Sequence, residues 1–595
     1  MTDVPAPPLR DGRGSRVLAA ALVEELVRAG ITDAVTSPGS RNTPLLLALA
    51  AAEGLTTHSV VDERTAGFVA LGLAKATGRP AILCCTSGSA VAQYLPAVVE
   101  AHHARVPLLV LTADRPAELR DVGAGQTIEQ NGIFGGSVRW AHELGLDTAD
   151  AAGVRYARTL AARACFAATG GLATPGPVHL NLPLREPLAP TGPAPEGPRP
   201  ARPGGAPWAR RTGRLGAPDA DALRRVAELL ATRPRAVVVA GRHETDPELG
   251  PALAALCELL GVPLLADPLS GARRGTAAIA AYDAFLRDPG AAPAGTELVL
   301  RLGDLPTSKP LRRWLAGLPP EVPQVHVAAD GVWQDPDGVL SDVVVAAPLP
   351  LLRELAPRLA HVERDPAWLP AWRRTDDAVV AAQAPLLDGA GADDAPTEPW
   401  LARELVALLP PAATLLVAAS MPIRDVEAFM APREAVRVLA NRGANGIDGT
   451  LATAWGLALG RAPGDGPVHV LLGDVALQHD VGSLLALGRS GVDLTVVLVD
   501  NDGGGIFHFL PVGAEPTPDV ERHVMTPTGL DVDAIVAAAG GTLHRVVRRG
   551  DLVPALRAAA GEAGLSVLYV RTERAANREL HRALEAAALA AVRSA

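Results

Sequence analysis

The residues best suited to chemistry are oxygen-bearing groups that follow two apolar, strand-like segments. Asp474 comes directly after VHVLLG, and Asn501 follows it by 27 residues, just beyond the second segment, LTVVLV. Gly503 opens a run of three glycines, where no side chain covers the backbone carbonyls. Magnesium prefers hard oxygen ligands and usually shares them with phosphates. A carboxylate, a carboxamide and a loop carbonyl at this spacing therefore predict a Mg²⁺ site.

The two apolar segments are predicted to be parallel strands that end at one crevice. In open α/β sheets the carboxyl ends of the strands face the ligand, so Asp474 and Asn501 should meet there. A Gly-Asp pair alone would favour an ordinary strand–turn–helix with an Asp cap, because short motifs often match by chance. The asparagine spacing and the glycine loop favour the metal site over that alternative.

A second chemically suitable residue, Glu63, lies near the amino end of the chain. It sits just past a predicted strand end and begins a helix, because Ala66, Val69, Ala70 and Leu73 follow at helical spacing. A glutamate in the first helical turn is also stabilised by the helix dipole, so position alone leaves a purely structural role open.

Helical and strand patterns alternate along most of the chain, which indicates parallel sheets covered by helices. We expect an α/β fold of three doubly wound parallel-sheet domains. Two segments rich in Pro and Gly cannot pack as a core and are predicted to be linkers. The predicted parts are a first domain over 1–190, a linker over 191–215, a middle domain over 216–380, a second linker over 381–399 and a third domain over 400–595.

Composition excludes several classes of function. The net charge of −10 argues against a nucleic-acid binder, since basic patches are the usual electrostatic footprint of those proteins. The four cysteines show neither C-x-x-C spacing nor a disulfide framework. The sequence shows no secretory or transmembrane pattern, so we expect a cytoplasmic protein without a membrane partner.

The metal pattern resembles the thiamine diphosphate signature, in which a Gly-Asp pair precedes an asparagine by about this distance. The chain departs from the common form at Val475 and Asp500, neither of which is an expected ligand. The resemblance implies that Asp474, Asn501 and Gly503 hold Mg²⁺ or Mn²⁺ against the diphosphate of the cofactor. It also implies that Glu63 faces the aminopyrimidine ring and promotes deprotonation of the thiazolium; the carbon chemistry itself belongs to the cofactor.

Several longer segments narrow the resemblance. The family they look like is the 2-succinyl-5-enolpyruvyl-6-hydroxy-3-cyclohexene-1-carboxylate synthase family of menaquinone biosynthesis; the segments are SPGSRNTPL, DERTAGFVALGLAKATG, TSGSAVAQYLPAVVEAHHARVPLLVLTADRPAELRDVGAGQTIEQ, ASMPIRD, NRGANGIDG and NDGGGIF. The middle part of the chain resembles the family mainly around LPTSKPLRRW. The family decarboxylates 2-oxoglutarate and adds the succinyl carbanion equivalent to isochorismate. Both substrates are dicarboxylates, which arginine forks bind bidentately.

The resemblance assigns further roles by position in the matched segments. Catalytic roles fall on Glu63, Gln126, Arg41, Arg115, Arg424 and Arg442, and Ser40, Lys309 and Ser420 are expected to join the arginines and Gln126 in binding substrate. Asn445 and Gly446 would meet the aminopyrimidine edge, and Ile447 would be the apolar wedge under the cofactor. Ile506, Phe507 and Leu510 would line the site on the metal side, with Ile506 also touching the cofactor; core packing at a loop exit is the alternative role of these three and is compatible with the first.

The resemblance also implies a homodimer at least, and commonly a homotetramer, with active sites at subunit interfaces. The alternative within the same superfamily is another 2-oxoacid decarboxylase or a carboligase of the acetohydroxyacid synthase type, which would not need four carboxylate forks. A catalytically inactive protein on this fold conflicts with the intact Glu63, Asp474 and Asn501. An NAD-binding dehydrogenase conflicts with the lack of G-x-G-x-x-G after a first strand. Metal preference and closure of the 515–526 loop over the site stay open.

Overall fold

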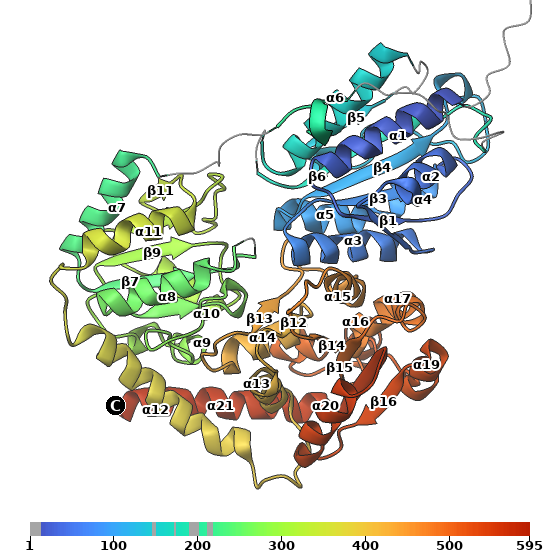
Figure 1. Cartoon of the computed structure of the whole chain (residues 1–595). Coiled ribbons are helices and arrows are strands. Elements are labelled where there is room, and N and C mark those ends of the chain that lie inside the picture. The colour runs from blue at the N-terminus through green and yellow to red at the C-terminus, as the bar shows by residue number, and fades with distance from the viewer. Residues whose placement is uncertain are drawn as a thin grey trace, which may run out of the picture. The chain divides into compact units, whose positions relative to one another are not determined.

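The computed structural model describes residues 13–144, 150–171, 174–189, 201–210, 218–244 and 246–594. The chain divides into two compact units (Figure 1). The first unit comprises residues 1–212 together with 442–462, and the second comprises 213–441 and 463–595. Most of the predicted first linker, 191–215, lies outside the described residues, as do the first twelve residues.

The first unit is built on one six-stranded parallel sheet, the N-terminal sheet. Its strand order is β2-β1-β3-β4-β6-β5. The central strands β3 and β4 are buried along their whole length, as expected for a parallel sheet covered on both faces. The strands are β1 (Asp33–Thr36), β2 (Thr56–Ser59), β3 (Ala81–Cys85), β4 (Leu108–Asp114), β5 (Trp140–Glu143) and β6 (Pro177–Pro183).

Helices cover the two faces of this sheet. Alternate strand residues such as Ile82 and Cys84 share one apolar core with α1, α2 and α6, because successive side chains of a strand point to opposite faces. Helices α3 and α5 lie on the other side of the strands (Figure 1). The helices are α1 (Arg13–Arg28), α2 (Thr43–Ala51), α3 (Glu63–Thr77), α4 (Ser89–Gln93), α5 (Leu95–Ala104) and α6 (Ala151–Ala168).

One helix of the first unit comes from far along the chain. α15 (Thr450–Leu459) packs against α3 with the backbones in close contact. A Cβ at Gly72 would lie 2.1 Å from the Thr453 carbonyl oxygen, and one at Gly456 would lie 2.0 Å from the Val69 carbonyl oxygen. Only glycine allows this approach. The predicted third domain, 400–595, is therefore not one body: residues 442–462 belong with the first unit because two glycines let α15 seat on α3.

The second unit contains two parallel sheets. The five-stranded middle sheet has the order β11-β10-β9-β7-β8. Its strands are β7 (Ala236–Ala240), β8 (Leu264–Ala266), β9 (Leu298–Leu302), β10 (Gln324–Val327) and β11 (Asp342–Val344). Its helices are α7 (Ala220–Thr232), α8 (Leu249–Leu260), α9 (Tyr282–Phe285), α10 (Lys309–Ala316) and α11 (Pro348–Leu359).

The six-stranded C-terminal sheet has the order β13-β12-β14-β15-β17-β16, again parallel throughout. Helices α13, α14 and α20 share one core with alternate residues of its central strands. The strands are β12 (Thr414–Val417), β13 (Arg437–Leu439), β14 (Val468–Gly473), β15 (Leu494–Asp500), β16 (Thr542–Arg545) and β17 (Leu565–Arg571). The helices are α13 (Glu398–Leu408), α14 (Met421–Phe429), α16 (Asp474–His479), α17 (Val481–Leu487), α19 (Val532–Ala539) and α20 (Leu552–Ala560).

Two long helices, α12 (Trp368–Asp388) and α21 (Arg574–Ser594), pack against each other within the second unit. Trp372 of α12 is fully buried among other aromatic rings, and the Gln383 amide donates to the Leu584 carbonyl oxygen at 3.2 Å. The segment 381–399, predicted to be a linker, is thus helical as far as Asp388, because its apolar residues have α21 to pack on. The helix α13 then begins at Glu398, still inside the predicted linker.

The fold class predicted from sequence is confirmed: the described residues form three parallel α/β sheets covered by helices. The other domain bounds stay predictions. Among the described helices, none combines the length and the apolar character that crossing a bilayer requires.

Candidate active site

Asp474 lies at the carboxyl end of the central strand β14, where it opens α16. Its side chain is 2% exposed, and Oδ2 accepts two hydrogen bonds, from the Gly503 N–H at 2.7 Å and from Thr528 Oγ1 at 2.9 Å. Burial raises the pKa of Asp474, while these hydrogen bonds oppose that rise. The carboxylate is therefore buried, oriented and joined to the glycine loop.

Asn501 lies one residue beyond the neighbouring strand, β15. Its Nδ2 donates to Glu398 Oε1 at 2.9 Å, whereas its Oδ1 is buried and has no hydrogen-bond partner. A buried carbonyl oxygen without a partner costs free energy unless another group satisfies it. A cation is such a group, and an amide oxygen is among its usual ligands.

The glycine loop leaves room for this arrangement. Gly503 has φ 125°, a left-handed conformation that favours glycine, and a Cβ there would lie 2.5 Å from the Met525 carbonyl oxygen. A Cβ at Gly505 would lie 2.7 Å from Asn501 Nδ2. A carboxylate, an unsatisfied amide oxygen and a bare loop carbonyl are the donor set that suits Mg²⁺ or Mn²⁺, so the residues fit the predicted metal.

The departure from the common signature at Asp500 has a local explanation. Asp500 is 2% exposed, and its Oδ2 accepts from Tyr569 Oη at 2.7 Å and pairs with Arg571 at 2.7 Å. Arg571 stands opposite Asp500 on the adjacent strand β17. The buried charge at this position is thus compensated by its own neighbours.

Three apolar residues follow the glycine loop in a short 3₁₀ helix, η6 (Gly505–Phe509), and its exit. Ile506 and Phe507 are half-buried, whereas Leu510 is 48% exposed. The ring of Phe507 packs over the glycine loop, because a Cβ at Gly504 would lie 2.6 Å from it. Their predicted contacts with cofactor and substrate stay predictions.

The second unit carries three more predicted substrate residues. Ser420 is the residue before α14 and has a left-handed conformation, with φ 77°. Its carbonyl oxygen accepts a hydrogen bond from the guanidinium of Arg424, which lies one helical turn further along and is exposed. Lys309 is exposed at the first position of α10, behind the cap residue Ser308. Ser308 Oγ in turn donates to the buried carboxylate of Asp283 at 2.6 Å. Both cations are therefore accessible at helix starts.

The first unit carries Glu63. It is the first residue of α3, with Asp62 as the cap that accepts from the Arg64 N–H at 2.9 Å. Burial raises the pKa of the Cys85 thiol at the end of β3, and the charges of Cys84 and Glu63 add to that rise. The predicted helix start at Glu63 is confirmed.

Arg41, Arg115 and Gln126 gather around the loops after β1, β3 and β4. Arg41 is buried and donates to the Leu184 carbonyl oxygen at 2.9 Å, yet its Nε has no hydrogen-bond partner. Arg115 donates to Ser87 Oγ, and desolvation together with the charge of Arg41 lowers its pKa. Gln126, at φ 56°, donates to the Ser87 carbonyl oxygen at 2.9 Å. Ser40 is exposed beside Arg41.

The loop from Arg442 to Ile447 is held against α5 in the same unit. The buried carboxylate of Glu100 accepts from the N–H groups of Gly443 at 2.8 Å and Ala444 at 2.6 Å. Asn445 is left-handed at φ 64°, Gly446 follows it, and the Ile447 carbonyl oxygen accepts from Thr450 Oγ1 at 3.0 Å. The loop is positioned, and the roles predicted for its residues stay predictions.

The predicted residues thus form two half-sites, described separately. The half-site of the first unit contains Ser40, Arg41, Glu63, Arg115, Gln126, Arg442, Asn445, Gly446 and Ile447; that of the second contains Lys309, Ser420, Arg424, Asp474, Asn501, Gly503, Ile506, Phe507 and Leu510. Sequence reasoning missed Glu398, Thr528 and Glu100. Each orients a predicted residue through a hydrogen bond that spans 54 or more positions, and local sequence carries no signal of such contacts.

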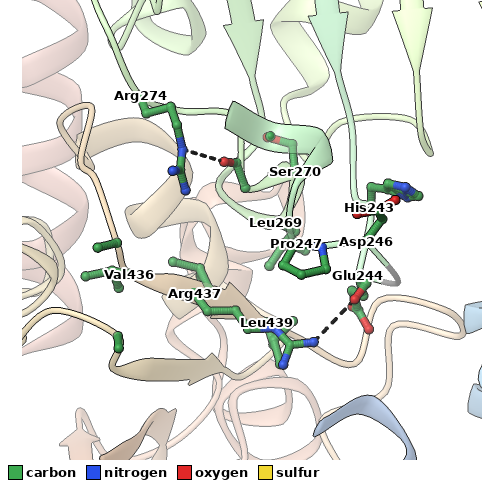
Figure 2. A pocket seen from close by; sticks show the side chains of 15 residues that line it. His243, Glu244, Asp246, Pro247, Leu269, Ser270, Arg274, Val436, Arg437 and Leu439 are labelled. Carbon is green, nitrogen blue, oxygen red and sulfur yellow. Dashed lines mark hydrogen bonds between the residues drawn. The ribbon is translucent and has the colours of Figure 1, made fainter. Parts of the chain in front are cut away.

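A cavity of about 170 Å³ in the second unit holds none of the predicted residues (Figure 2). Its two arginines are already engaged: Arg274 donates to the Gly271 carbonyl oxygen at 2.9 Å and pairs with Glu434, and Arg437 donates to the Glu244 carbonyl oxygen at 3.3 Å. We assign no part of the chemistry to this cavity.

Comparisons with known proteins agree with this geometry. Residues 16–133 match the thiamine pyrophosphate enzyme N-terminal TPP-binding domain, and residues 424–570 match the corresponding C-terminal TPP-binding domain. A solved structure of a proposed thiamin diphosphate-dependent enzyme from Mycobacterium smegmatis has the same fold: TM-score 0.69, 19% identity, 93% of this chain and 99% of that chain. Fold and domains together define a thiamine diphosphate-dependent enzyme.

Relatives at higher identity define the family. A 2-succinyl-5-enolpyruvyl-6-hydroxy-3-cyclohexene-1-carboxylate synthase of Bacillus velezensis is 40% identical over 586 residues, covering 96% of this chain and 97% of the relative. The synthase of Thermobifida fusca is 43% identical over 589 residues, covering 97% and 100%. The chain belongs to this synthase family, as the resemblance of its motifs implied.

Proposed function

We propose that the protein decarboxylates 2-oxoglutarate and adds the succinyl carbanion equivalent to isochorismate. The products are 2-succinyl-5-enolpyruvyl-6-hydroxy-3-cyclohexene-1-carboxylate and CO₂, so the step belongs to menaquinone biosynthesis. Family membership over the whole chain supports the reaction. The observation that carries it in the structure is the buried, unsatisfied Asn501 Oδ1 near the oriented Asp474 carboxylate.

Asp474, Asn501 and the Gly503 carbonyl would hold Mg²⁺ or Mn²⁺ and, through it, the diphosphate of thiamine diphosphate. When bound, this cofactor supplies an electron sink for the carbanion left by decarboxylation of a 2-oxo acid. Glu63, a partly buried carboxyl group at the start of a helix, would exchange a proton with the aminopyrimidine ring of the cofactor. Ile447 would hold the cofactor in its bent conformation. Ile506, Phe507 and Leu510 would keep water from the reacting face of the cofactor.

The substrates carry four carboxylates between them, and the predicted arginines and lysine of both half-sites suit them. Arg424 and Lys309 are accessible in the second unit. Arg41, Arg115 and Arg442 lie in the first, where Arg41 is buried, pairs with Glu186 at 3.3 Å and has an Nε without a hydrogen-bond partner. Bidentate arginine contacts orient a carboxylate as well as neutralise it, which favours a dicarboxylate acceptor over a small neutral one.

We further propose a homodimer at least, forming a homotetramer, in the cytoplasm. Val61 is 77% exposed and Val122 67% exposed, and both lie in the loops of the first half-site, Val61 two residues before Glu63. Single exposed apolar side chains are normal on protein surfaces, so the proposed assembly rests on the family resemblance.

The test is a coupled assay with thiamine diphosphate, Mg²⁺, 2-oxoglutarate and isochorismate, with the product followed by mass spectrometry. We expect the cyclohexene adduct, lost in the Glu63→Gln variant. Decarboxylation without the adduct would keep the cofactor and refute the acceptor, which would favour the acetohydroxyacid synthase type of reaction. No turnover of any 2-oxo acid would refute the proposal.

A further inference from the structure

Glu398 contacts the predicted metal ligand Asn501 from a distant part of the chain. It is the first residue of α13, is 6% exposed, and its Oε1 accepts two hydrogen bonds. The donors are Asn501 Nδ2 at 2.9 Å and Thr572 Oγ1 at 2.9 Å. One carboxyl oxygen thus binds the residues that follow two neighbouring strands, β15 and β17.

This contact selects one orientation of the Asn501 amide. Glu398 Oε1 accepts from Thr572 Oγ1 independently of Asn501, so this oxygen is an acceptor, whether or not the other carboxyl oxygen carries a proton. It therefore attracts the NH₂ end of the amide and repels the carbonyl end. A rotation of the amide by about 180° would place two acceptors against each other, so Oδ1 is kept pointing away from Glu398.

The backbone around this contact resists adjustment. β15 and β17 are paired in parallel register up to Asp500 opposite Arg571, and the Thr572 N–H then donates to the Asp500 carbonyl oxygen at 3.0 Å. A Cβ at Gly505 would crowd Asn501 Nδ2 at 2.7 Å, so the amide fills a space shaped for it. The result is the buried Oδ1 without a partner described above.

We propose that Glu398 is a positioning residue for the metal site: it holds the Asn501 amide so that Oδ1, and not Nδ2, is offered to the divalent cation. The inference rests on the proposed function, because it assumes a metal at Asp474 and Asn501. Partners that orient a metal ligand from outside the coordination shell commonly change metal affinity by about 10–100-fold when they are removed.

The test measures Mn²⁺ binding to the full chain by the electron paramagnetic resonance signal of the free ion, with thiamine diphosphate present. We expect Glu398→Ala to raise the apparent dissociation constant of Mn²⁺ by about 10–100-fold. Activity at saturating metal should recover most of its loss, because the chemistry itself is untouched. Glu404→Ala is the matched control on the same helix: Glu404 pairs only with the adjacent Arg403 among the contacts described, and the constant should not move.

Glu398→Gln keeps the size of the side chain and guards against a variant that fails to fold. A glutamine can offer either its oxygen or its NH₂ group to Asn501, so orientation is selected less strongly and we expect a weakening of roughly threefold to tenfold. Circular dichroism and the melting midpoint of the metal-free chain establish that each variant is folded.

The outcomes separate the two proposals. Wild-type affinity for Mn²⁺ in both folded Glu398 variants would overturn the positioning role while leaving the metal site in place. Equal Mn²⁺ binding by wild type and Asn501→Ala would overturn the metal site itself, and the positioning role with it. Weakened binding in the order Ala, then Gln, with Glu404→Ala unchanged, would support both.

Discussion

The N-terminal and C-terminal sheets share one topology but treat the polar groups at their strand ends differently. Their orders, β2-β1-β3-β4-β6-β5 and β13-β12-β14-β15-β17-β16, correspond strand for strand. Predicted site residues follow the first, second and fourth strands in chain order of both sheets, and in the C-terminal sheet Asp474 also follows the third. The same scaffold thus presents loops at equivalent places for two different tasks.

The difference lies at the strand that is fourth in each order. In the N-terminal sheet β4 ends at Asp114, whose carboxylate accepts from Asn181 Nδ2 at 2.8 Å and pairs with Arg120 at 3.0 Å. In the C-terminal sheet the last residue of β15, Asp500, is likewise compensated, by Tyr569 and Arg571, but the next residue, Asn501, has an Oδ1 without a partner. The chain's own groups thus satisfy the last residue of both strands, and the unsatisfied oxygen one residue beyond β15 is what marks a ligand-binding end.

The ligand-binding end gives the largest expected effect. Asp474→Ala removes the only charged group of the predicted donor set, so we expect activity to fall by roughly 10²–10³-fold, since metal stabilisation is worth several kcal/mol and each 1.4 kcal/mol is a tenfold change. Steady-state rates across a Mg²⁺ titration measure it. If the variant keeps activity within tenfold of wild type at ordinary Mg²⁺ concentrations, the C-terminal sheet does not carry the metal site and the contrast between the two sheets fails.

Both sheets should lose stability to a similar extent at low pH, because each contains one buried histidine. Burial lowers the pKa of His179 on β6 and of His469 on β14 from 6.5 to about 4 each. Between pH 6.5 and about 4 the unfolded chain therefore binds more protons than the folded one. The contribution of these two histidines to the free energy of unfolding is fully present above pH 6.5 and is lost as the pH falls through about 4. At pH 5 each histidine should cost about 2 kcal/mol.

Urea unfolding at pH 7 and pH 5 measures this loss. The variants His179→Gln and His469→Gln should each reduce the difference between the two pH values. His179 is bonded to Thr112 Oγ1 at 2.7 Å, whereas His469 Nδ1 has no partner, so the first substitution should lower stability at pH 7 more than the second. An unchanged pH difference in both variants would contradict the prediction.

The strand end at Asp114 should matter for stability and not for metal. Asp114→Ala removes an acceptor from Asn181 Nδ2 and the ion pair from Arg120, although both still donate to Glu143, at 3.1 Å and 2.7 Å. We expect a loss of about 1–3 kcal/mol in the free energy of unfolding, the usual cost of stranding buried polar groups. The Mn²⁺ dissociation constant should stay at the wild-type value. A tenfold change in this constant would mean that Asp114 affects metal binding and would contradict its purely structural role.

The smallest effect is expected where the chain departs from the common signature. Asp500→Asn can keep its oxygen on the Asp502 N–H, which now donates to Oδ1 at 3.0 Å, and donate its NH₂ to Tyr569 Oη. It then loses only the ion pair with Arg571, which is 54% exposed. Such a partly exposed pair contributes less than about 1 kcal/mol. The melting midpoint and the metal affinity should therefore both stay close to wild type, and a large drop in either would mean that the Asp500 charge serves the site.

Local pattern predicted the elements well and long-range contacts poorly. The run VHVLLG was predicted as a strand and is β14 with the same bounds, and Glu63 opens α3 as expected, because alternation, apolar runs and helix caps act over a few residues. Glu398 was hidden inside a predicted linker, since nothing near it indicates that its partners lie 103 and 174 positions away. The assignment of α15 to the first unit depends likewise on two glycines, Gly72 and Gly456, whose pairing appears only in space.

The seating of α15 on α3 sets where the chain can be cut. In a fragment containing only residues 400–595, α15 would lose its packing against α3. The residues from Thr450 to Leu457, all buried in the full chain, would then be exposed. A fragment ending near residue 212 would lack that helix and leave α3 uncovered. Chimeras and truncations of this protein should therefore exchange residues 1–212 and 442–462 together, as a single discontinuous module.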